Sequence, residues 1–178
     1  MKFFMKRKGI NSFSGLLFGV IILTVIFSSC LNLDDTEMPT RESEKVELNK
    51  YLTNLITAGK DVDTTNTGIY YIIMDKGTGA FPKNGDTLTV GYAGYLLSGF
   101  LFDASAWHNQ TDSTFTFVLG DPPMIKGWDD GMKVINKNAK VQLIIPSDYA
   151  YGSMGAGVIP PFNTLVFVIK MKDIKPSK

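Results

Sequence analysis

A change of hydrophobic period at Gly68 is the feature that most limits how this chain can fold. From there on, the pattern is that of β-strands, with apolar residues at every second position in residues 87–97 and 139–145. Within residues 87–97, Leu88, Val90 and Tyr92 share one face. Further strand-like segments cover residues 69–75, 114–119, 139–145 and 165–174. One stripe with helical spacing interrupts them, formed by Ile125, Trp128, Met132 and Ile135. Several strands around one short helix predict an α+β domain.

The beginning of the chain has the organisation of a secretory signal. Four basic residues within the first eight are followed by a run of 12 mostly apolar residues, Leu16–Phe27, and then by Ser28, Ser29 and Cys30. A membrane-spanning helix is the alternative, but the run is short for a span of about 20 residues. No basic stop follows it. We therefore expect residues 1–29 to be a signal peptide that is removed.

The segment Ser28-Ser29-Cys30 resembles the lipobox of bacterial lipoproteins, in which the cysteine becomes the acylated first residue. Cys30 is the only cysteine of the chain, so its lipidation would leave no thiol for a disulfide or for catalysis. The resemblance implies a membrane-anchored lipoprotein of the cell envelope, on the periplasmic or the surface side.

Residues 30–67 are expected to be a lipid-anchored tether with one helix at 42–58. The helical spacing is that of Leu48, Leu52, Leu55 and Ile56. We place the N-cap of this helix at Ser43 and its end at Gly59. So short a helix needs packing to persist. It would lie against the following domain or meet a second copy of the chain, and an isolated surface helix is an equal alternative.

Side chains that could carry acid–base, metal or nucleotide chemistry are few. The single histidine, His108, lies in a polar loop without partners for a metal site, and we expect it to be solvated. The glycine-rich stretch 152–157 lacks the Lys-Ser/Thr ending of a phosphate loop. Removal of residues 1–29 takes away four of the 18 basic residues and none of the 17 acidic ones, which leaves a net charge of −3. That balance does not favour nucleic acid as a partner. We expect no metal and no cofactor.

Five motifs in order carry a specific resemblance to a known family. They are GYAGYLLSGFLFDAS at 91–105, FTFVLG at 115–120, MIKGWDDGM at 124–132, DYAYGSMGAGVIPP at 148–161 and TLVFVIKM at 164–171. Together they resemble the FKBP family of peptidyl-prolyl cis–trans isomerases, here in a bacterial lipoprotein form. The match runs from about Gly68 to Lys175, which is 108 of 178 residues. The isomerase domain is accordingly expected at residues 68–178.

The resemblance implies a curved antiparallel β-sheet wrapped around one short α-helix, with a pocket between them and a helical N-terminal extension in front. It places the aromatic walls at Tyr92, Phe102, Phe115 and Phe167, with Trp128 as the floor. Met124 and Ile125 would lie at the entrance of the helix, where the Ile125 backbone N–H faces the ligand. Tyr151, Val158 and Ile159 would form the rim, and Asp103 would be the one buried carboxylate. The catalytic residues implied are Asp103, Tyr151 and Ile125.

The activity that the resemblance implies is isomerisation of X-Pro bonds in unfolded or partly folded envelope proteins, with macrolides as inhibitors. A dry aromatic pocket suits this reaction, because it removes the preference of water for the planar, more polar amide. Two alternatives stay open. One is a non-catalytic peptide-binding or chaperone module, and the other is a structural lipoprotein of a surface or motility assembly.

One departure from the family pattern lies beside Asp103. The loop at residues 106–113 is longer than in the small members, and it has no arginine where many members pair a guanidinium with the buried aspartate. The ionic partner of Asp103 is therefore left open by the sequence.

Overall fold

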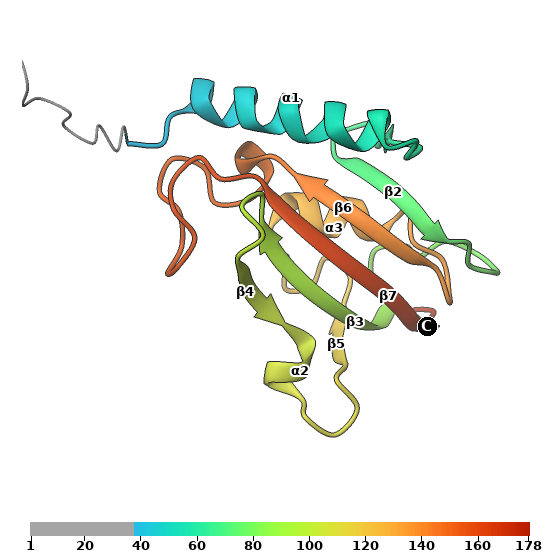
Figure 1. Cartoon of the computed structure of the whole chain (residues 1–178). Coiled ribbons are helices and arrows are strands. Elements are labelled where there is room, and N and C mark those ends of the chain that lie inside the picture. The colour runs from blue at the N-terminus through green and yellow to red at the C-terminus, as the bar shows by residue number, and fades with distance from the viewer. Residues whose placement is uncertain (1–37) are drawn as a thin grey trace, which may run out of the picture. The chain divides into compact units, whose positions relative to one another are not determined.

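The computed structural model describes residues 38–178 (Figure 1). The signal peptide expected at 1–29 and the lipidation site expected at Cys30 lie outside these residues. The elements in order are α1 Arg41–Thr57, β1 Asp63–Thr64, β2 Tyr70–Asp75, β3 Thr87–Leu96, β4 Leu101–Ala104, α2 Ser105–His108, β5 Phe115–Val118, α3 Lys126–Met132, β6 Lys140–Ile145, the 3-10 helix η2 Ser147–Tyr149 and β7 Leu165–Lys175. No helix among residues 38–178 is long and apolar enough to cross a membrane.

The seven strands form one antiparallel sheet in the order β1-β2-β6-β7-β3-β4, and β5 also pairs with β3. Strand β3 is the centre of this arrangement. It pairs along its whole length with β7, from Thr87 opposite Lys175 to Leu96 opposite Leu165. On its other side, the first half of β3 pairs with β5 and the second half with β4. Side chains from β3, β4, β5 and β7 are thereby brought to one region of the sheet.

The two faces of β6 meet different neighbours. Leu143 and Ile145 belong to the main core with the residues of α3, whereas Ile144 packs with Leu48 and Leu52 of α1. This follows from the period of two, because successive side chains of a strand point to opposite faces. Figure 1 shows α1 running along the β2–β6–β7 end of the sheet. The sheet thus lies between α3 on one face and α1 on the other.

Helix α3 approaches the sheet closely because two of its inward positions are glycines. A Cβ built on Gly127 would lie 2.2 Å from a methyl carbon of Ile145, and one built on Gly131 would lie 2.4 Å from a methyl carbon of Leu143. Both distances are far below van der Waals contact, so only glycine fits there without a shift of the helix. The close approach buries Trp128 and Met132, which are 3% and 0% exposed.

Helix α1 begins at a capping box formed by Thr40 and Ser43. The Thr40 side chain accepts from the Ser43 N–H at 3.1 Å, and the Ser43 hydroxyl accepts from the Thr40 N–H at 2.9 Å. The N-cap is therefore Thr40, and the prediction that Ser43 is the N-cap was wrong. Ser43 is instead the N3 residue of the same capping box. The apolar side of α1 lies against the sheet. Of the arrangements expected from the sequence, the structure therefore shows packing against the following domain.

A buried carboxylate fastens α1 to the end of β6 and the start of β7. Glu44 is 7% exposed and accepts hydrogen bonds from the Ser147 N–H at 2.7 Å, from the Ser147 hydroxyl and from the Thr164 hydroxyl at 2.7 Å. Beside it, Arg41 pairs with Asp148 at the surface. The first turn of α1 is thus bound to η2, the 3-10 helix after which the chain continues to Tyr151.

The predicted fold class is confirmed: a curved antiparallel sheet packs on a short helix, with a helix in front of it. The predicted stripe of α3 ends at Met132, and Ile135 follows the helix yet remains fully buried. The short elements β1, β4 and α2 were not predicted, because two to four residues are too few to show a period.

Candidate functional site

The aromatic residues singled out in the sequence surround one hollow between α3 and the sheet, with a volume of about 90 Å³. This is less than the ~300–1,000 Å³ of sites for drug-sized ligands, so the hollow suits a single side chain. Its lining consists of Tyr92, Phe102, Asp103, Phe115, Met124, Ile125, Trp128, Tyr151 and Phe167. These residues come from β3, β4, β5, the N-terminal end of α3, the loop after η2 and β7.

The aromatic rings of the hollow support one another edge to face. The Trp128 ring lies 5.1 Å from that of Phe167 and 5.3 Å from that of Tyr92, centroid to centroid, with interplanar angles of 75° and 77°. Phe102 meets Phe167 at 5.5 Å and 87°. Such pairs add about 0.5–1.5 kcal/mol each beyond the area they bury. The rings of the wall therefore stabilise one another without any ligand.

Glycine at position 94 of β3 makes room for two of these rings. A Cβ at Gly94 would lie 2.7 Å from the edge of the Phe102 ring and 2.8 Å from that of Phe167. The rings consequently rest directly on the backbone of β3, and the depth of the hollow depends on this glycine.

The polar side of the hollow is organised around the Asp103 carboxylate. Tyr92 donates its hydroxyl to Asp103 Oδ2 at 2.7 Å, and His108 Nε2 lies 2.7 Å from Asp103 Oδ1. Burial, together with the hydrogen bond to Asp103, raises the pKa of the Tyr92 phenol well above its ordinary value. Burial and the charge of Asp103 also raise the pKa of Tyr151. Both phenols therefore remain protonated donors at neutral pH.

Two N–H groups beside the hollow have no acceptor within the described residues 38–178. The Ile125 N–H, just before the first turn of α3, donates to no acceptor among residues 38–178. The buried indole Nε1–H of Trp128 also lacks a partner within the described residues. By contrast, the Met124 N–H is already engaged with the Asp129 carboxylate at 3.0 Å. An acceptor that enters the hollow could bond to the Ile125 N–H, whereas the indole N–H is buried out of reach of solvent.

Two of the expected rim residues do not line the hollow. Ile159 is 7% exposed and packs in the main core, and Val158 is 64% exposed at the surface. Their substrate-binding role stays a prediction.

His108 was expected to be solvated, and its side chain is indeed exposed, but its contact with Asp103 was not predicted. Its side chain is 55% exposed, yet its Nε2 contacts Asp103. The sequence offered one signal, the missing arginine in the loop after Asp103, but nothing in the spacing alone told which residue replaces it.

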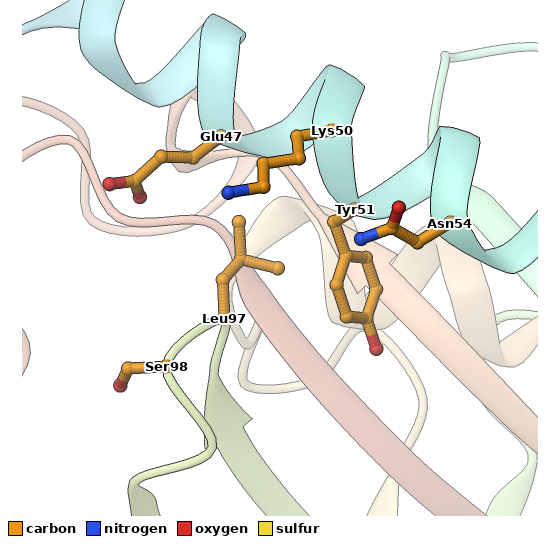
Figure 2. Close-up of a pocket in the computed structure, with 6 residues that line it drawn as sticks. All are labelled: Glu47, Lys50, Tyr51, Asn54, Leu97 and Ser98. Atoms are coloured by element: carbon orange, nitrogen blue, oxygen red, sulfur yellow. The ribbon is translucent and has the colours of Figure 1, made fainter.

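A larger hollow of about 300 Å³ lies between α1 and the turn after β3. Figure 2 shows its lining, with Glu47, Lys50, Tyr51 and Asn54 projecting from α1 and Leu97 and Ser98 on the facing turn. Charged and amide groups make up most of its helix side, and the hydroxyl of Tyr51 is held by Gln142 at 3.0 Å. It contains none of the residues predicted for the site. The smaller, ring-lined hollow is therefore the better candidate.

Comparison with known proteins now decides the family. The family model described as FKBP-type peptidyl-prolyl cis-trans isomerase matches residues 78–172, which is more than half of the chain. This chain belongs to the FKBP-type isomerase family. Among the family's proteins, peptidyl-prolyl cis-trans isomerase Fkbp12 of Drosophila melanogaster is 38% identical over 110 residues, which covers 61% of this chain and 99% of that protein.

Bacterial FKBP-type isomerases are similar to this chain over a part of their length. FkpA of Escherichia coli K12 is 40% identical over 118 residues, or 66% of this chain and 42% of FkpA. A probable FKBP-type isomerase of Haemophilus influenzae is 40% identical over 120 residues, or 67% of this chain. The chain spans about half the length of these relatives, 42% and 48% respectively.

Solved FKBP-type structures have the same fold. The crystal structure of a peptidyl-prolyl cis-trans isomerase from Pseudomonas syringae superposes with a TM-score of 0.65 at 32% identity, covering 79% of this chain and 99% of that one. The crystal structure of E. coli FkpA superposes with a TM-score of 0.63 at 34% identity, covering 77% of this chain and 63% of that one.

Proposed function

We propose that this chain catalyses cis–trans isomerisation of X-Pro bonds in unfolded or partly folded proteins of the cell envelope. The observation that carries the proposal is the hollow between α3 and the sheet. It is lined by rings, has room for one small side chain and has the unpaired Ile125 N–H beside it. Membership of the FKBP-type isomerase family supports the same reaction.

A hollow of this kind is sufficient for the reaction, because preferential binding of the twisted amide accelerates it. Rotation about an amide costs about 18–20 kcal/mol, because resonance gives the C–N bond partial double-bond character. The twisted amide has lost that resonance and its charge separation, so it is less well solvated by water than the planar form. An apolar pocket removes the difference in solvation and binds the twisted state preferentially. A hundredfold acceleration requires only about 2.7 kcal/mol of such preference.

Each polar group of the hollow has a role in this scheme. The proline ring enters between the rings and over the Trp128 indole. The Ile125 N–H and the Tyr151 hydroxyl donate to the carbonyl groups of the peptide and hold the amide in its twisted geometry. Asp103 fixes the Tyr92 wall through their hydrogen bond and sets the electrostatic potential at the mouth. Val158 and Ile159 are proposed to contact the flanking residues of the substrate.

The proposal is tested by the rate at which the purified chain isomerises a short X-Pro peptide. We expect acceleration that a macrolide inhibits, and a loss of about two- to tenfold in Tyr151→Phe, since one hydrogen bond contributes about 0.5–1.5 kcal/mol. Peptide binding without acceleration would instead support a non-catalytic binding module. An unchanged rate in Tyr151→Phe would remove that hydroxyl from the mechanism.

We further propose that residues 1–29 are a lipoprotein signal peptide, that residues 30–67 are a tether anchored at Cys30, and that residues 68–178 form the isomerase domain. The supporting observations are the apolar run before Cys30 and the match of the family model to residues 78–172. Cys30→Ser should move the protein from the detergent phase to the aqueous phase in a partitioning experiment. Partitioning equal to that of the unaltered chain would refute the anchor.

A further inference from the structure

The Asp103 carboxylate at the hollow is held from both sides, by the phenol of Tyr92 and by the imidazole of His108. Oδ2 accepts from the Tyr92 hydroxyl, and Oδ1 faces His108 Nε2, each at 2.7 Å. Asp103 is 33% exposed and His108 is 55% exposed, so the pair lies at the boundary between the hollow and solvent. The contact therefore joins an ionisable group of the surface to the wall of the site.

The position of His108 is determined by its surroundings. It is the last residue of α2, a single turn that directly follows β4 and Asp103. Ser105, which begins this turn, is buried and accepts from the Tyr92 N–H at 3.0 Å while it donates to the Ser113 carbonyl at 2.6 Å. The turn is thus fixed to β3 and to the far end of its own loop. The imidazole stays within reach of the carboxylate.

His108 is the only histidine of the chain, and histidine is the side-chain type whose charge ordinarily changes in the physiological pH range. The neighbouring phenols, Tyr92 on β3 and Tyr151 after η2, have pKa values raised above the ordinary 10.0 and stay neutral. Asp112, in the loop after α2, directs its carboxylate to the Thr114 N–H and hydroxyl. Lys126, on α3, lies over the ring of Tyr149.

We propose that His108 is a positioning residue for Asp103, and that its protonated form keeps the hollow in the state that best accepts an X-Pro bond. This inference rests on the proposed isomerase function. An imidazolium makes a charge-assisted hydrogen bond to the carboxylate, which is shorter and stronger than a neutral one. It also cancels the negative charge beside the hollow.

Loss of that proton leaves a carboxylate without a counter-charge at the mouth. The bare charge retains water and repels the carbonyl oxygen of an entering amide, and both effects oppose transfer of the amide into the apolar hollow. The pair is partly exposed, so solvent screens most of its interaction. We expect kcat/KM to fall by about threefold between pH 5.5 and pH 8, in keeping with the strength of partly exposed ion pairs.

Two substitutions separate the charge of His108 from its hydrogen bond. His108→Arg supplies a cation at every pH, and His108→Gln supplies a neutral donor at every pH. The rates are measured on the full chain by NMR exchange spectroscopy, with a blocked X-Pro peptide that has no ionisable group. This assay avoids a coupling protease, whose own pH dependence would interfere.

The expected pattern has three parts. The unaltered chain loses activity as pH rises, His108→Arg keeps the high value of low pH throughout, and His108→Gln stays near the low value throughout. A flat profile in the unaltered chain overturns the inference, and so does a His108→Gln profile that still falls with pH.

A second measurement keeps this inference separate from the proposed function. If the unaltered chain accelerates no peptide at any pH, the isomerase proposal fails, and the affinity for the same peptide decides the role of His108. Calorimetry should then show dissociation constants that rise about threefold from pH 5.5 to pH 8 in the unaltered chain and stay constant in both variants. Constant affinity in the unaltered chain overturns the role of His108.

Discussion

Removal of the Glu44 carboxylate tests how α1 is held on the domain. Glu44→Ala leaves three donors without their acceptor: the Ser147 N–H and the hydroxyls of Ser147 and Thr164, both residues being 1% exposed. The backbone N–H cannot turn away, so leaving it buried and unpaired lowers the free energy of unfolding by about 1–3 kcal/mol. The two hydroxyls can rotate toward other acceptors, and the loss of each hydrogen bond lowers the free energy of unfolding by roughly 0.5–1 kcal/mol. We therefore expect a loss of about 3 kcal/mol in the free energy of unfolding.

Urea unfolding followed by circular dichroism measures this loss. With a slope of about 2 kcal/mol per molar urea, as is typical of small domains, the midpoint should fall by roughly 1.5 M. Glu47→Ala is the matched control, because Glu47 is an exposed glutamate of the same helix that projects from it in Figure 2. Its effect should stay within about 0.5 kcal/mol. Equal midpoints for the two variants would refute the reasoning that the buried carboxylate anchors α1.

Three further predictions concern the core, the hollow and the dependence of stability on pH in the acid range. Trp128→Ala should destabilise the fold by about 3–5 kcal/mol and abolish peptide binding; a thermal melt and calorimetry check this, and intact affinity would place the indole outside the site. Gly94→Ala should lower the free energy of unfolding by about 1–3 kcal/mol, because its Cβ would lie within 2.9 Å of the Phe102 and Phe167 rings. An unchanged urea midpoint would contradict this. Backbone N–H donors, that of Lys83 first, hold the pKa of Asp86 below its usual range, so its contribution to stability is present above about pH 4 and is lost on further acidification. Asp86→Asn should flatten stability between pH 2 and 5, and an identical acid profile would disprove this assignment.

The sheet and α3 could be predicted because their signals are local. Alternation along residues 87–97 marks β3 within one residue of its observed end at Leu96. The stripe through Trp128 marks the buried side of α3. The nine residues that line the hollow were all among those implied by the resemblance to the FKBP family, because each lies in one of the motifs that carry the resemblance.

The interactions of lone polar residues could not be predicted in the same way. His108 is one imidazole in a polar loop, and its contact with Asp103 depends on the four-residue turn α2, which is too short to show a period. Glu44 has the sequence context of an exposed helical glutamate, and its burial depends on where Ser147 and Thr164 arrive from the opposite end of the chain. Such contacts follow from tertiary packing rather than from spacing.

The two glycines on the inner side of α3 have a consequence for which rings can enter. Because Gly127 and Gly131 let the helix backbone settle against Ile145 and Leu143, the height of the Trp128 indole is determined by how near the helix axis comes to the strand. A single methyl group at either glycine would push the helix away from the strand and displace the Trp128 indole with it. The room for a proline ring in the proposed site would thus depend on two positions, Gly127 and Gly131, that do not line the hollow.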